Sequence, residues 1–181
     1  WTKQYRASET ERIESMDRLV EWLPENIPPA EDTSIVHGDF RIDNLIVHPA
    51  ELRVIAVLDW ELSTLGSPLA DFSYHMMAWR LTQQQFRGMA QHDLTHLGIP
   101  GEHEYMLAYC RRTGREAIDA RDWEFYMAFS MFRMAAILQG IARRALDGTS
   151  ADPDAPEVGK RARAVADVAW NHVRRLSDAR G

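Results

Sequence analysis

The chain has 181 residues, of which 45% are hydrophobic and 27% are charged. This length is enough for one domain with a hydrophobic core and too short to expect two domains. The formal net charge of −6 argues against a general nucleic-acid surface, and charges such as Arg133 interrupt the apolar runs before they reach the length of a membrane span. Cys110 is the single cysteine, so we expect neither an internal disulfide nor a cysteine-based zinc site. We therefore expect a cytoplasmic protein with neither a nucleic-acid nor a membrane partner.

The N-terminal part of the sequence predicts one helix followed by short extended segments. Ser8 and Glu11 have the spacing of a capping box, and apolar residues recur behind them at helical spacing until the prolines of residues 24–29. Three segments rich in β-branched residues follow with short connections between them, at residues 34–37, 44–48 and 53–58. They predict a small hairpin layer and not a large sheet.

From Pro68 onward the pattern is almost entirely helical. Ser67 is a candidate N-cap before Pro68, and Thr82 with Gln85 opens another candidate helix. Further helices are predicted over residues 102–113, 119–146 and 154–176, and the stripe of methionine and aromatic residues in the longest of them is interpreted as core. The sequence thus predicts a single, mainly α domain over residues 1–181, with a β-hairpin region at residues 34–60 and a helical region at residues 67–178.

The candidate chemistry lies in the hairpin region, in the stretch "IVHGDFRIDNLIVHP". Asp39 and Asn44 are five residues apart across a predicted tight loop, so their side chains can meet at one point. Asp59 follows fifteen residues after Asn44, and a hairpin of this length returns it beside Asn44. An amide and a carboxylate oxygen are hard ligands that suit Mg²⁺. The remaining carboxylate, Asp39, can face a hydroxyl group, which completes the set of groups that phosphoryl transfer needs.

A resemblance to a known family rests on these same motifs. H-G-D-x-x-x-x-N over residues 37–44 resembles the catalytic-loop signature of protein kinases, with Gly38 in place of arginine. This glycine form is similar to that of the aminoglycoside phosphotransferase and choline kinase family, whose members share the protein-kinase fold and phosphorylate small molecules. "VLDWE" takes the place of the kinase D-F-G segment, and "PLADFSY" resembles the helix that fastens the catalytic loop. The longer stretch "VLDWELSTLGSPLAD" most resembles the kinase-like domains that are joined to acyl-CoA dehydrogenases.

The resemblance implies the C-terminal lobe of a protein-kinase-like fold. It implies Asp39 as the catalytic base, Asn44 and Asp59 as ligands of Mg²⁺, and ATP as the donor to a hydroxyl group of a small molecule. His37 and Asp71 would be structural supports of the catalytic loop.

Some assignments stay open in the sequence. Arg41 and Asp43 are candidates for contacts with phosphate or within the loop. Solvent exposure explains Asp43 equally well and is the commoner explanation for an arginine such as Arg41. No glycine precedes Gly38, and no glycine-rich phosphate loop occurs anywhere. We therefore expect an N-terminal ATP-binding lobe upstream of this sequence, and no catalysis by this chain alone. The acceptor, the choice between ATP and GTP and the oligomeric state are left open.

Three other interpretations compete with the kinase-like one. The polar residues of the hairpin can serve as turn and cap residues only. A metal-dependent hydrolase would use His37, Asp39, His48 and His75 as ligands of a transition metal, although these histidines lack the i, i+4 spacing of a helical site. A non-catalytic binding module with a kinase-like fold is the third, and the complete set of carboxylates and amide argues against it.

Overall fold

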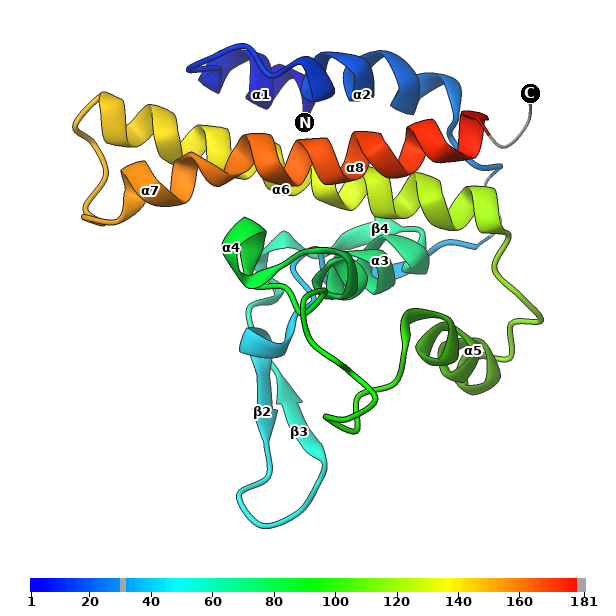
Figure 1. Cartoon of the computed structure of the whole chain (residues 1–181). Helices are drawn as coiled ribbons and strands as arrows, with labels where there is room; N and C mark the ends of the chain where they lie inside the picture. The colour runs from blue at the N-terminus through cyan, green and yellow to red at the C-terminus, as the bar shows by residue number, and fades with distance from the viewer. Residues whose placement is uncertain (30–31, 179–181) are drawn as a thin grey trace.

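The computed structural model describes residues 1–29 and 32–178 of the chain. Helices dominate, and the strands form two small antiparallel sheets, which confirms the predicted mainly α class with a small β region. Helices α6 and α8 form a middle layer, with α1 and α2 on one side and α3 on the other (Figure 1). The helices are α1 (Thr2–Ser8), α2 (Glu14–Glu25), α3 (Pro68–Arg80), α4 (Gln83–Phe86), α5 (Glu102–Thr113), α6 (Ala120–Leu146), α7 (Ala155–Gly159) and α8 (Arg161–Asp178). The strands are β1 (Ser34–Val36), β2 (Leu45–Val47), β3 (Val54–Val57) and β4 (Thr64–Gly66).

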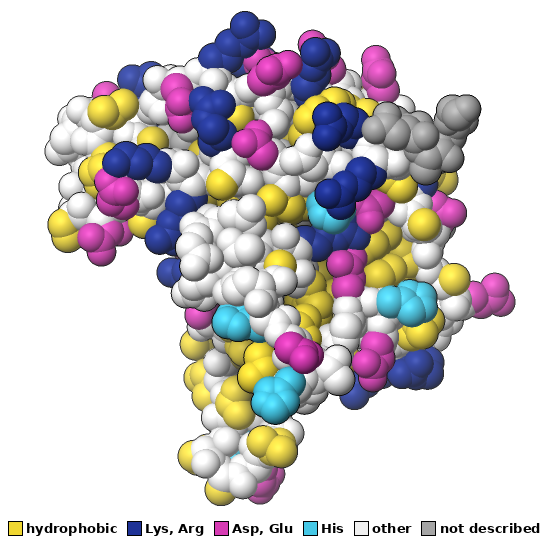
Figure 2. All heavy atoms as spheres, in the orientation of Figure 1, with side chains coloured by type: hydrophobic (Ala, Val, Ile, Leu, Met, Phe, Trp, Pro, Cys, Tyr) yellow, Lys and Arg dark blue, Asp and Glu magenta, His cyan; other side chains and the backbone are white. Residues whose placement is uncertain are grey.

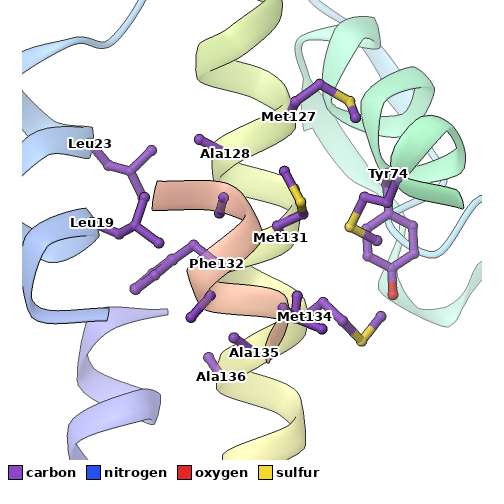
Figure 3. Close-up of a cluster of buried hydrophobic side chains, with 14 of the residues drawn as sticks. Leu19, Leu23, Tyr74, Met127, Ala128, Met131, Phe132, Met134, Ala135 and Ala136 are labelled. Atoms are coloured by element: carbon purple, nitrogen blue, oxygen red, sulfur yellow. The ribbon is translucent and has the colours of Figure 1, made fainter. Parts of the chain in front are cut away.

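Helix α6 is the centre of the hydrophobic core, because it contacts helices of both neighbouring layers. Met127, Met131 and Leu138 on this helix expose none of their surface. Figure 3 shows this part of α6 between Leu19 of α2 and Tyr74 of α3. By length and composition α6 is also apolar enough to cross a membrane, but 61% of its apolar window is buried inside the protein. Its apolar character is thus accounted for by its place in the core.

The predicted starts of three helices are confirmed. The Ser67 side chain accepts a hydrogen bond from the backbone N–H of Leu69 at the start of α3. Thr82 and Gln85 form a reciprocal capping box at α4. The Asp119 carboxylate accepts from two backbone N–H groups at the start of α6. These side chains satisfy N–H groups that have no partner inside the helix, which is why the local sequence predicts these starts well.

The predicted capping box at Ser8 and Glu11 is wrong. Ser8 is the last residue of α1, which the sequence did not predict, and α2 begins after Ile13 without a side-chain cap. The segment between α1 and α2 is instead bonded to α6: the backbone N–H and the hydroxyl of Thr10 both donate to Oε1 of Gln139, at 3.1 and 2.8 Å. A contact between residues this distant in sequence overrides the local capping pattern.

The helix predicted from residue 154 to residue 176 is interrupted. Helix α7 ends at Gly159, and α8 begins after Lys160. A Cβ atom at Gly159 would lie 2.6 Å from the Cβ atom of Ala142 on α6, so the close approach of the two helices requires glycine there. The predicted core stripe of α8 is confirmed, since Ala162, Val165 and Ala169 are fully buried.

The strands pair differently from the predicted single hairpin layer. β2 and β3 form an antiparallel hairpin, with Leu45 opposite Val57. β1 pairs instead with β4, which the sequence did not predict, and Ile35 lies opposite Leu65. The β1–β2 connection contains a 3₁₀ turn over Ile42–Asn44, and the two strands that it joins lie in different sheets.

The strand region exposes many large apolar side chains. The β2–β3 hairpin projects from the helical body (Figure 1), and yellow apolar side chains are visible on it in Figure 2. Leu52 is fully exposed, and Ile35 and Leu65 expose about 70% of their surface (72% and 71%). The other exposed large apolar residues of this region are Ile42, Ile46, Val47, Val54, Ile55, Leu58, Trp60 and Leu62. A concentration of this kind is typical of a surface that another part of a protein covers.

Candidate active site

The turn after β1 is built around Gly38. Its φ angle is +84°, and a Cβ atom there would lie 2.5 Å from the carbonyl oxygen of Leu62. Both the backbone conformation and the lack of space require glycine. The turn therefore lies directly against the segment that follows Asp59, which explains physically why glycine stands between His37 and Asp39.

Hydrogen bonds to Asp71 and His37 hold this turn in place. The Asp71 carboxylate, on α3, accepts from the backbone N–H groups of both His37 and Gly38. The buried His37 ring bonds through Nε2 to the carbonyl oxygen of Leu58 at 2.6 Å, and its Nδ1 accepts from the N–H of Asp39 at 3.2 Å. Since a carbonyl oxygen only accepts, the ring hydrogen is on Nε2 and both ring nitrogens are engaged. His37 thus ties the loop to the end of β3 and has no nitrogen left for a metal or a substrate.

Asp39 is held by several side chains. Its Oδ2 accepts from Nε of Arg41 and from Nδ2 of Asn44, both at 3.0 Å, and Asn44 also donates to its backbone oxygen at 2.8 Å. Tyr74 on α3 lies close enough for its phenol to feel the charge of this carboxylate. Burial and, after it, the charge of Asp39 raise the pKa of Tyr74 to about 12, so this phenol remains a donor at neutral pH. The sequence analysis predicted that the Asp39 carboxylate would stand apart from other groups. It did not identify Tyr74, because this residue is one aromatic residue in an apolar helix and belongs to no motif.

The hairpin brings Asn44 to the residue that precedes Asp59. The N–H of Leu58 donates to the carbonyl oxygen of Asn44 at 2.8 Å, so the hairpin brings the residue after Leu58 beside Asn44. Asn44 is buried, its Nδ2 is used by Asp39, and no donor in the described part of the chain uses its Oδ1. Asp59 is exposed and adopts a left-handed conformation with φ 66° and ψ 50°. Such a conformation in a non-glycine residue is costly and is frequent at functional sites.

These two side chains fit a magnesium ion. Asn44 offers an amide oxygen, and the carboxylate of Asp59 makes no hydrogen bond or ion pair with the residues that the structure describes. Mg²⁺ takes oxygen ligands and usually keeps waters and substrate phosphates in its shell, so a pair of protein ligands is enough. The residues could thus hold Mg²⁺ only together with a phosphate-bearing ligand.

Arg41 and Asp43 form an ion-pair cluster beside this pair. Arg41 donates through Nη1 to Asp43 at 2.9 Å, while its Nε is bonded to Asp39. Arg87, directly after α4, donates to the same oxygen of Asp43 at 2.8 Å. Asp43 is therefore engaged by two guanidinium groups. Arg87 was missed by the sequence analysis, because it lies 44 residues from Asp43 and belongs to no motif.

The proposed transition-metal ligand set is not brought together. His37 is fully engaged by backbone groups, His48 lies in the β2–β3 turn with its Nδ1 bonded to a backbone N–H, and His75 lies among aromatic rings of the catalytic loop, α3 and α5. Over residues 1–29 and 32–178, no group of three histidine, cysteine or carboxylate side chains could hold a metal ion. The ligand set predicted for the hydrolase, His37, Asp39, His48 and His75, is therefore wrong.

A cavity of about 390 Å³ lies against the same loop. Its lining residues are Ile35, His37, Phe40, Val57, Trp60, Pro68, Asp71, Phe72, His75, Tyr105, Ala108, Tyr109 and Arg112. Burial lowers the pKa of His75. His37 and Phe40, which flank Gly38 and Asp39 in the loop, line the cavity, whereas Asp39 and Asn44 are not among its lining residues.

The comparison with known proteins decides the family. Residues 1–129 match the model of the phosphotransferase enzyme family. The chain belongs to this family. A crystal structure of a candidate aminoglycoside phosphotransferase from Ralstonia eutropha JMP134 is similar to this phosphotransferase with a TM-score of 0.90 and 56% sequence identity, over 97% of this chain and 53% of that one.

Curated relatives include much longer proteins. Acyl-CoA dehydrogenase family member 10 of Mus musculus is 50% identical over 173 residues, which are 94% of this chain and 16% of that protein. Acyl-CoA dehydrogenase family member 11 of Rattus norvegicus is 43% identical over 157 residues, 85% of this chain and 20% of that protein. The resemblance to kinase-like domains of acyl-CoA dehydrogenase relatives is thereby confirmed. Because this phosphotransferase matches so small a part of them, their dehydrogenase names describe a different domain.

Proposed function

We propose that this phosphotransferase transfers the γ-phosphoryl group of ATP to a hydroxyl group of a small molecule, and that the chain is the C-terminal lobe of its kinase-like fold. The observation that carries this proposal is the joint placement of Asp39, Asn44 and Asp59. The Asn44 side chain donates a hydrogen bond to Asp39. The backbone oxygen of Asn44 accepts one from the N–H of Leu58, the residue before Asp59. One carboxylate for the hydroxyl and two oxygen ligands for a metal ion are the parts that phosphoryl transfer requires.

Each side chain has a distinct role in this proposal. Asp39 orients the acceptor hydroxyl and accepts its proton, while the hydrogen bond from Asn44 fixes the direction of its carboxylate. Asn44 and Asp59 would hold Mg²⁺, which bridges and neutralises the phosphate groups when it is bound. Arg41, already bonded to Asp39, is placed to balance negative charge near the transferred group.

The ATP-binding lobe is proposed to lie in the part of the full-length protein outside this chain. Support comes from the solved relative, of which this chain matches 53%, and from the exposed apolar surface of the strand region. A lobe that packs on this surface would cover side chains such as Ile35 and Leu65 and would supply the phosphate-covering loop. We therefore expect this chain alone to be inactive.

The acceptor is proposed only as a class. Aminoglycoside is the name of the related family and of the solved relative. Among the residues that the structure describes, the cavity beside the loop is lined by a single carboxylate, Asp71, which does not favour a polycation. The similarity to acyl-CoA dehydrogenase relatives favours a hydroxyacyl-type acceptor, by analogy alone.

Calorimetric titration of Mg²⁺·ATP into the full-length protein tests the function. We expect saturable binding that Asp59→Ala abolishes and that the control Asp154→Ala, a change at an exposed carboxylate before α7, leaves intact. Binding that is unaffected by Asp59→Ala would refute the assigned metal ligand. Absence of any binding by the full-length protein would refute the kinase function and favour a binding module.

A further inference from the structure

Arg133 of α6 is a half-buried cation without an anionic partner in the described part of the chain. Its Cζ atom lies 4.7 Å from the ring centroid of Tyr74 and 5.1 Å from that of Trp1. Its Nε atom is buried and has no hydrogen-bond partner. The rings interact with the charge but leave the N–H donors of the guanidinium unused. An arginine in this state has donors to spare for a ligand.

Arg80 shows how this chain treats a buried arginine of purely structural role. Its side chain, 8% exposed, forms forked hydrogen bonds to both Glu102 and Glu124. Burying a charge without such partners is costly, so carboxylates normally accompany it. Arg133 packs against the same helix α3 that carries Arg80, yet no carboxylate of the described chain pairs with it.

The position of Arg133 connects it to the proposed reaction. The Tyr74 ring that contacts its guanidinium, at 4.7 Å, belongs to a phenol that feels the charge of Asp39. A single side chain, Tyr74, thus interacts with both Arg133 and Asp39, the carboxylate that would meet the acceptor hydroxyl.

We propose that Arg133 binds an anionic group of the acceptor, a carboxylate or a phosphate, and so selects hydroxyl compounds that carry negative charge. This inference rests on the proposed function for the acceptor, although anion binding by Arg133 can be measured without it. A guanidinium forms paired, charge-assisted hydrogen bonds with either group. The same unpaired cation repels a polycationic acceptor, so an aminoglycoside is disfavoured at this site.

The test follows the Arg133 side chain by NMR in the full-length protein, with its Nε–H signal assigned by its loss in Arg133→Met. Inorganic phosphate and acetate are titrated separately at constant ionic strength, which distinguishes a phosphate from a carboxylate site. We expect one probe to shift both this signal and the backbone amide of residue 133 in a saturable manner. In Arg133→Lys, followed through the same backbone amide, the probe should bind about ten-fold more weakly because the fork is lost. The exposed Arg111 on α5 is the matched control and should show only a linear drift.

The possible results distinguish failure of the anion site at Arg133 from failure of the proposed kinase function. If neither probe moves the Arg133 signal more than that of Arg111, the anion site is refuted, whatever the result with Mg²⁺·ATP. If Arg133→Met does not fold, the Lys variant decides, since unchanged binding in it would equally contradict the proposal. Saturable anion binding in a protein that ignores Mg²⁺·ATP would keep the site and remove the kinase function.

Discussion

The helical layers and the strand region of this phosphotransferase are stabilised in different ways. In the layers, side chains such as Met131 and Leu138 are fully buried. In the strand region, Leu52, Ile35 and Leu65 are largely exposed. There the turn after β1 is held by hydrogen bonds that its backbone N–H groups donate, above all to the Asp71 carboxylate. Apolar burial thus stabilises the helical layers, whereas local hydrogen bonds position the candidate site residues on the exposed surface of the strand region.

If this division is correct, the largest effect on activity should leave the fold nearly unchanged. We expect Asp39→Asn in the full-length protein to lower phosphotransfer about 10²- to 10⁴-fold, because the base is lost while the amide oxygen can still accept hydrogen bonds. The thermal midpoint should change little. Asp43→Asn, which alters the other carboxylate partner of Arg41, is the control and should keep most of the activity. Equal losses in both variants would contradict the assignment of Asp39. Turnover of the bound phosphoryl donor is the measurement.

Truncating an apolar side chain should lower the free energy of unfolding in the helical layers and leave it nearly unchanged in the strand region. Leu138→Ala removes a fully buried side chain from α6 and should lower the free energy of unfolding by about 2–5 kcal/mol. Leu65→Ala, at a side chain that is 71% exposed, should change it by about 0.5 kcal/mol or less in this chain. Denaturant unfolding of both variants measures the difference. Similar costs would mean that the strand region also contributes to the core.

The catalytic turn should be sensitive to a single methyl group. Gly38→Ala forces a Cβ atom against the carbonyl oxygen of Leu62 at positive φ, and we expect a cost of about 1–3 kcal/mol with a displaced loop. Gly140→Ala in the middle of α6 is the matched control. It has ordinary space around it and should stabilise the helix by about 0.5–1 kcal/mol. Chemical denaturation gives both values, and a neutral Gly38→Ala would contradict the described turn.

The smallest expected effect is a dependence of stability on pH at the boundary of the two regions. Burial lowers the pKa of His75 below its ordinary value of 6.5. The unfolded chain therefore binds the proton first, so stability that is present above pH 6.5 is lost as the pH falls through the lowered pKa. We expect His75→Phe to flatten the stability profile in this acid range relative to wild type. The exposed His96→Phe should leave the profile as it is, and thermal melts at several pH values would show the contrast.

The sequence predicted local features well and distant contacts poorly. Helix starts with their own caps, such as Ser67 and Asp119, were found because the partner groups lie within three residues. The return of Asp59 beside Asn44 follows from hairpin length alone. Tyr74 was missed, since its contact with Asp39 depends on how α3 packs beneath the loop.

Two errors have the same cause. The capping box predicted at Ser8 does not form, and Thr10 is bonded to Gln139 instead. Strand β4 was not predicted, and it forms by pairing with β1. In both places a contact between distant segments decides the structure, and no local pattern reports it.

The most direct test of the central claim is to locate the metal ion by paramagnetic broadening. Mn²⁺·ATP is added to the ¹⁵N-labelled full-length protein in substoichiometric amounts. The account predicts that the side-chain amide of Asn44 and the backbone amides of Leu58 and Asp59 lose their signals first, that the side-chain amide of Gln139 in the core persists, and that Asp59→Ala restores the lost signals. Broadening centred on the histidines of the loop and hairpin, or spread evenly over the acidic surface, would contradict the account.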